Sequence, residues 1–82
     1  MNLLEIPGVG KKTKQGLIKM GYYEVEDLIN VDPEKLYEKY NNMVGYTEDR
    51  CQLYVYRCAI YFANNLDKLP KDIHWWDFKD KK

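Results

Sequence analysis

Hydrophobic residues recur every three or four positions along most of the chain, and this spacing predicts a small all-α domain. The pattern is strongest from Thr47 to about Asn64, where it predicts a long helix at the centre of the core. A hydroxyl cap at Thr47 and the two acids that follow it suit the start of this helix. Its apolar stripe comprises Cys51, Tyr54, Val55, Cys58, Tyr61 and Phe62, widened by Leu53, Ala59 and Ile60.

Four shorter helical segments precede the long one, and they begin near Leu3, Lys11, Val25 and Asp32. Gly21 suits the end of the second segment. In the third, Val25, Leu28 and Ile29 are expected to face inward, and in the fourth, Leu36, Tyr37 and Tyr40. The fourth starts with Asp32 as its cap and is expected to end at Asn41-Asn42.

The prediction is therefore a compact five-helix domain over residues 1–66, with a Trp-rich tail at 67–82 packed on the same domain. Residues 73–78 of the tail are too apolar to extend freely into solvent. Adjacent Trp75 and Trp76 cannot both point inward from one helix face, so one is expected to be buried against the first or the long helix. The alternative is that both are exposed and form a partner surface.

The turn between the first two segments is the strongest functional signal, with the sequence Pro7-Gly8-Val9-Gly10. Pro7 and Gly8 suit the two central positions of a type II turn. Val9 is predicted to be an apolar plug, and Gly10 lets a ligand approach the backbone. The helix that follows begins with unpaired amides at its positive dipole end, which is a ready site for an anion.

Three lysines surround this helix start: Lys11, Lys12 and Lys14, with no acid among residues 6–23. A cation here opposes the helix dipole at a cost of roughly 0.3–1 kcal/mol, whereas a bound phosphate would attract both the amides and the lysines. The segment therefore predicts a phosphate site formed by Gly8, Val9, Gly10, Lys11, Lys12 and Lys14. The alternative is that these are ordinary solvated lysines in a loop.

The spacing Leu3-x-x-Ile6-Pro7-Gly8-Val9-Gly10, followed by Leu17, resembles the helix-hairpin-helix motif of DNA-repair and recombination proteins. The whole chain is similar to the small bacterial "pathogenicity locus" proteins, which carry one such motif. The similarity extends over the hairpin, the helix from Asp49 to Asn65 and the sequence Trp75-Trp76-Asp77-Phe78-Lys79. It implies a fold like that of SAM and helix-hairpin-helix domains, and DNA-backbone binding by hairpin amides without sequence readout.

Two positions depart from the usual motif. Lys14 occupies a place where the motif has a small residue, so its side chain either lies over the helix pair or points outward. Gly16 lies inside the second helix at a cost of roughly 1 kcal/mol relative to Ala, which a close neighbour could offset.

A second hairpin is expected at residues 42–47 in domains that duplicate the motif, but this segment retains only Gly45. Arg50 and Arg57 lie on one side of the long helix and either contact a phosphate or pair with acids of the middle segment. Gly45, Arg50 and Arg57 are therefore secondary candidates.

Charge is distributed unevenly along the 82 residues, although the net charge is zero. Residues 1–20 carry +3, residues 21–49 carry −6, and the remainder carries +3. This distribution argues against a general polyanion binder and favours modest binding on one side.

Other chemistry has little support in the sequence. Cys51 and Cys58 fall two helical turns apart, roughly 10 Å, which is too far for a disulfide, and both are expected in the core. His74 is the only histidine, so no zinc site, cofactor or small-molecule substrate is expected, and no nucleophile–base pair suggests an enzyme. No leader or membrane span is apparent, which predicts a cytoplasmic location. The protein is expected to be a monomer.

The sequence thus predicts a non-catalytic module that binds a nucleic-acid backbone, DNA before RNA. The alternative is a protein-interaction module that keeps the fold and has lost DNA binding.

Overall fold

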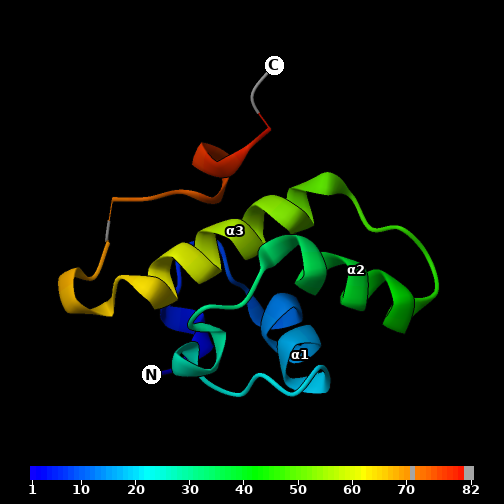
Figure 1. Ribbon diagram of the computed structural model, residues 1–82, viewed down its shortest axis with the longest axis horizontal. Helices are drawn as coiled ribbons and strands as arrows, with labels where there is room; N and C mark the ends of the chain where they lie inside the picture. Colours follow the sequence, from blue (N-terminus) through cyan, green and yellow to red (C-terminus); the bar gives the residue numbers. More distant parts are fainter. Residues whose placement is uncertain (71, 81–82) are drawn as a thin grey trace.

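Three α-helices and four 3₁₀ turns make up the regular structure in the computed structural model, which describes residues 1–70 and 72–80. The helices are α1 (Lys11–Lys19), α2 (Pro33–Val44) and α3 (Arg50–Asn64), shown in Figure 1. The 3₁₀ turns are η1 (Leu3–Glu5), η2 (Val25–Leu28), η3 (Leu66–Lys68) and η4 (Trp75–Phe78). These residues include no β-strand, which confirms the all-α prediction, but two of the five expected helices are single 3₁₀ turns.

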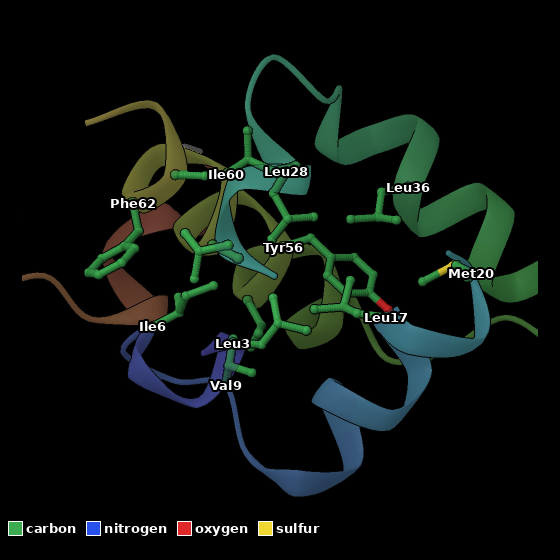
Figure 2. Close-up of a cluster of buried hydrophobic side chains, with 14 of the residues drawn as sticks. Leu3, Ile6, Val9, Leu17, Met20, Leu28, Leu36, Tyr56, Ile60 and Phe62 are labelled. Carbon is green, nitrogen blue, oxygen red and sulfur yellow. The ribbon is translucent and has the colours of Figure 1, made fainter. Parts of the chain in front are cut away.

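Helix α3 runs through the centre of the fold, as predicted, and eight of its fifteen residues are buried. Tyr61 belongs to the predicted apolar stripe but is 46% exposed, because it lies on the side of the helix that the core does not cover. Tyr56 is wholly buried although it lies outside the predicted stripe, and Figure 2 shows Leu17, Leu28 and Leu36 arranged around its ring. The hydroxyl of Tyr56 has no hydrogen-bond partner among the described residues, and burial raises its pKa. The side chain of Tyr56 thus lies among residues of α1, η2 and α2.

The first turn of α3 differs from the prediction. The capping residue is Asp49 instead of Thr47, and its carboxylate accepts a 2.8 Å hydrogen bond from the Cys51 amide. Cys51 is exposed, so the expectation that both cysteines lie in the core is wrong for Cys51 and correct for Cys58. The reason is position: Cys51 lies in the first helical turn, before the buried run that begins at Leu53.

Helices α1 and α2 approach each other closely at Gly16. A Cβ atom there would lie 3.0 Å from Cε1 of Tyr40, so the glycine admits the neighbour that offsets its low helix propensity. Gly21, with φ +97°, ends α1 as predicted. The Gly21 and Tyr22 amides donate to the carbonyls of Ile18 and Leu17, which completes a Schellman motif.

Helix α2 begins as predicted. The Asp32 carboxylate accepts a hydrogen bond from the Glu34 amide, and Pro33 occupies the first helical position. It continues through Val44, past the expected end at Asn41-Asn42. The stop is Gly45, whose left-handed conformation (φ +81°) costs glycine little.

Burial in η2 and α2 follows the predicted pattern except at one position. Leu36 and Tyr40 are buried and Tyr37 is half-buried, but Ile29 is exposed, because the chain becomes extended there and helical spacing no longer sets its direction.

The C-terminal tail returns along α3, and η4 packs against that helix (Figure 1). Trp76 is 50% exposed, and Trp75 packs on the core but is half-buried, where full burial of one tryptophan was expected. Residues 71, 81 and 82 of the predicted segment 67–82 lie outside the described residues. Within the described part, no helix is both long and apolar enough to cross a membrane.

Candidate nucleic-acid interface

The hairpin that precedes α1 is a closed type II turn. The amide of Val9 donates to the carbonyl of Ile6 at 3.1 Å, and Gly8 between them has φ +87°. Ile6 and Val9 are both buried and anchor the two ends of the turn in the core (Figure 2). Val9 is therefore the apolar plug that the sequence predicts, and its side chain is not available to a ligand.

Two elements from the other end of the chain support the hairpin. The thiol of Cys58 on α3 donates to the carbonyl of Pro7 at 3.5 Å, and burial raises its pKa to about 11, so at neutral pH it stays a donor. Trp75 packs on Gly8 so closely that a Cβ atom on the glycine would lie 3.1 Å from both Cβ and Cδ1 of Trp75. The tail thus forms part of the hairpin's surroundings, which the sequence does not reveal.

The start of α1 is open. Gly10 is its N-cap, with an extended backbone and no side-chain cap, and the first turn contains no acid. The first bond of the helix runs from the amide of Lys14 to the Gly10 carbonyl (2.9 Å). Within residues 1–70 and 72–80 no acceptor is bonded to the amides of Gly10, Lys11 or Lys12. A Cβ atom on Gly10 would meet nothing within 4 Å, so the helix start can be approached from outside.

The three lysines differ in how they are placed around this start. Lys11 and Lys12 are exposed. Lys14 is half-buried, and its ammonium group donates to the side-chain oxygen of Asn2 at 3.2 Å, back toward η1. The structure therefore brings Gly8, Gly10, Lys11 and Lys12 to one open helix start and turns Lys14 partly away from it.

The secondary candidates do not form a comparable open start. Gly45 ends α2, and the helix start that follows is already capped by Asp49. Glu48 is fixed by two contacts with α2: its amide donates to the Asn41 side chain at 2.8 Å, and the Tyr37 hydroxyl donates to its carbonyl. The positive end of α3 therefore already has an internal carboxylate.

Both arginines of α3 are engaged in ion pairs. Arg57 pairs with Glu34 at 2.8 Å and with Asp80 at 2.9 Å, while Arg50 pairs with Asp80 at 2.6 Å. For Arg57 the geometry thus favours pairing with an acid of the middle segment, one of the two alternatives. The guanidinium of Arg57 and then that of Arg50 lower the pKa of Asp80, so the tail carboxylate stays charged.

Other kinds of site find little support in the geometry. A hollow of about 200 Å³ beside the hairpin is lined by Met1, Glu5, Pro7, Phe62, Leu69 and Pro70. It has no lysine or arginine among its described lining residues, so it does not suit a phosphate. In the described part of the chain, no three His, Cys, Asp or Glu side chains are placed to hold a metal ion.

The fold and this site define a small all-α domain that presents an uncapped, lysine-flanked helix start behind a glycine turn. Over residues 1–82 the chain matches the family described as "pathogenicity locus" (Cdd1), and it belongs to that family. A 38-residue segment is 53% identical to DNA polymerase IV 2 of Methanosarcina mazei, covering 46% of this chain. The match spans 10% of that polymerase, and no solved structure matches the chain.

Proposed function

We propose that this protein binds nucleic-acid backbones without sequence preference and without catalysis, through a helix-hairpin-helix element formed by η1, the turn at residues 6–10 and α1. DNA is the preferred target. The observation that carries the proposal is the open start of α1, where unpaired amides are flanked by two exposed lysines, Lys11 and Lys12.

A backbone phosphate suits this arrangement because each of its charges meets a complementary group. The amides of Gly10, Lys11 and Lys12 can donate to phosphate oxygens, and the helix dipole favours an anion there by roughly 0.3–1 kcal/mol. The ammonium groups of Lys11 and Lys12 add an attraction that salt screens. None of these groups contacts a base edge, so the proposed contact carries no sequence information.

The similarity to part of a DNA polymerase supports a nucleic-acid target over a protein one. The proposal assigns one phosphate site per chain, because the helix start of α3 is capped and both of its arginines are paired. One site implies modest affinity with a shallow dependence on salt.

The alternative function is a protein-interaction module. The neutral net charge and the ion pairs that occupy Arg50 and Arg57 favour it. Under this alternative the hairpin serves the fold only, and Lys11 and Lys12 are solvated surface residues.

An NMR titration of labelled protein with a short DNA duplex at low salt tests the proposal. We expect shifts centred on the amides of Gly8, Gly10, Lys11 and Lys12 that disappear as salt is added. Changing Lys11 and Lys12 together to Glu should lower the affinity for all sequences alike, and should remove most of the salt dependence, which for one bound phosphate is a slope of log K against log salt of about −0.9.

The matched control changes two other exposed lysines, Lys19 and Lys35, to Glu, which alters the net charge by the same amount. If both double variants weaken binding to the same extent, the interaction is a nonspecific charge effect. An absence of shifts in the wild type would reject the nucleic-acid function and favour the protein-interaction alternative.

A further inference from the structure

We propose that Trp76 and His74 form a stacking platform for an unpaired nucleobase, so that the preferred ligand is a nucleic acid with a single-stranded segment next to the bound phosphate. This inference rests on the proposed function and specifies its ligand. It comes from the arrangement of the tail, which the phosphate site itself does not use.

The platform is already assembled in the structure. The rings of His74 and Trp76 are stacked, with centroids 4.4 Å apart and planes inclined by 12°. Trp75 meets Trp76 edge-on, with centroids at 5.6 Å and planes at 84°. His74 covers one indole face, and Trp76 is still 50% exposed, so part of its ring surface is open to an aromatic ligand.

The turn that carries these rings is held in place by its own hydrogen bonds. The Asp77 carboxylate accepts from the amide of His74 at 3.0 Å and lies 3.5 Å from Nδ1 of its ring. At the end of the tail, Asp80 pairs with Arg50 and Arg57 on α3. A ligand that stacks on Trp76 therefore meets a pre-organised surface, which lowers the entropy cost of binding.

The platform adjoins the phosphate site through Trp75. The indole of Trp75 packs on Gly8, and the next residue along the chain is Trp76, so the Cα atoms of Gly8 and Trp76 lie within about 10 Å of each other. Successive nucleotides of a stacked strand advance about 3.4 Å. A strand whose phosphate lies at the hairpin can therefore place a base on the platform within a few nucleotides.

A nucleobase fits this surface better than a charged group does. Asp77 lies in the same turn, so a phosphate on this surface would meet a carboxylate, whereas a neutral base has no such repulsion. Bases in a duplex are already stacked and paired, whereas an unpaired base has a free face. Stacking on an aromatic side chain tolerates every base, which agrees with a contact that reads no sequence.

The experiment compares a short oligothymidine strand with a blunt-ended duplex at low salt, for the wild type, Trp76→Ala, Trp76→Phe and Tyr23→Ala. Tyr23 is the matched control because it is 64% exposed and follows the other end of α1. We expect Trp76→Ala to weaken binding of the single strand at least about fivefold, with Trp76→Phe and Tyr23→Ala near the wild type. The single strand should also quench the fluorescence of Trp76, and duplex affinity should be unchanged.

The possible failures are distinguishable. If the Lys11 and Lys12 double variant loses binding but Trp76→Ala does not, the phosphate site stands and the stacking platform is rejected. If the wild type binds neither probe, the proposed function itself falls. If Trp76→Ala instead changes the oligomeric state of the protein, the surface belongs to a protein contact and the base-stacking proposal is overturned.

Discussion

The chain has two helices that each follow a glycine in a left-handed conformation, and their starts are opposites. Gly8 (φ +87°) precedes α1, and Gly45 (φ +81°) precedes α3. The start of α3 is closed by the carboxylate of Asp49, whereas the start of α1 has no side-chain cap and no acid in its first turn.

The difference shows what separates a structural helix start from a candidate binding site. Unpaired amides at a helix start require an acceptor, which the protein or water or a ligand supplies. At α3 the protein supplies its own anion, so an external phosphate would have to displace a carboxylate. At α1 the lysines lie at the positive end of the helix dipole, which is unfavourable, and an external anion would offset this unfavourable interaction. The presence or absence of an internal acid is therefore the feature that the following predictions alter.

The largest expected effect concerns the two glycines themselves. Gly8→Ala should lower the free energy of unfolding by about 2–3 kcal/mol, because the left-handed backbone is strained for alanine and the new methyl group crowds Trp75. Gly45→Ala meets only the backbone strain, since nothing lies within 4 Å of its Cβ position, and should cost about 1 kcal/mol. Urea unfolding of both variants measures the difference.

A double-mutant cycle with Trp75→Ala sharpens this comparison. Removing the indole takes away the Cδ1 contact and keeps the Cβ contact, so it should make Gly8→Ala partly less costly and leave the cost of Gly45→Ala unchanged. Equal costs for the two glycine variants in the wild-type background would mean that the tail does not brace the hairpin.

The second prediction converts the open helix start into a closed one. Gly10→Asp should raise the free energy of unfolding by about 0.5 kcal/mol, because the carboxylate caps α1 and attracts Lys11 and Lys12. The backbone at Gly10 is extended, with φ −98°, and accepts the side chain without strain. The same substitution should weaken DNA binding more than about tenfold, since it places an anion where the phosphate is proposed to bind.

Increased stability together with lost binding is the distinctive result. A variant that loses binding only because it unfolds would show both quantities falling together. If Gly10→Asp binds DNA as the wild type does, the start of α1 is not the phosphate site.

Much of this contrast is visible in the sequence, because both glycines, the three lysines and the acids around position 49 belong to local patterns. The type II turn, the buried Val9 and the end of α1 at Gly21 follow from rules that operate within a few residues. The end of α2 lies beyond the predicted Asn41-Asn42, because two asparagines resemble a helix C-terminus as strongly as Gly45 does. Cys51 is exposed although its spacing predicts a core position, because helical spacing does not show where along a helix the core ends.

The contacts that the sequence could not predict are those between distant segments. Trp75 on Gly8, the Cys58 thiol on the Pro7 carbonyl and the ion pairs of Asp80 each join segments far apart in the chain. The aromatic tail was expected to pack, but nothing in its pattern specifies the partner. The candidate site was therefore predictable as a local motif, while its support by the tail was not.

The smallest expected effect is a pH dependence of the free energy of unfolding that arises from the capped start of α3. Accepting the amide hydrogen bond of Cys51 lowers the pKa of Asp49 below its ordinary value of 3.8, so the folded state prefers the carboxylate. Its contribution to stability is present above that ordinary value and is lost as the pH falls through the lowered pKa. Asp49→Asn keeps an uncharged cap at every pH. Urea unfolding between about pH 6 and pH 3 should therefore show the wild type losing slightly more stability than the variant. Glu26 and Asp80 are unchanged in both proteins, so their titration cancels in the comparison, and parallel curves would mean that the Asp49 carboxylate is not the internal anion of α3.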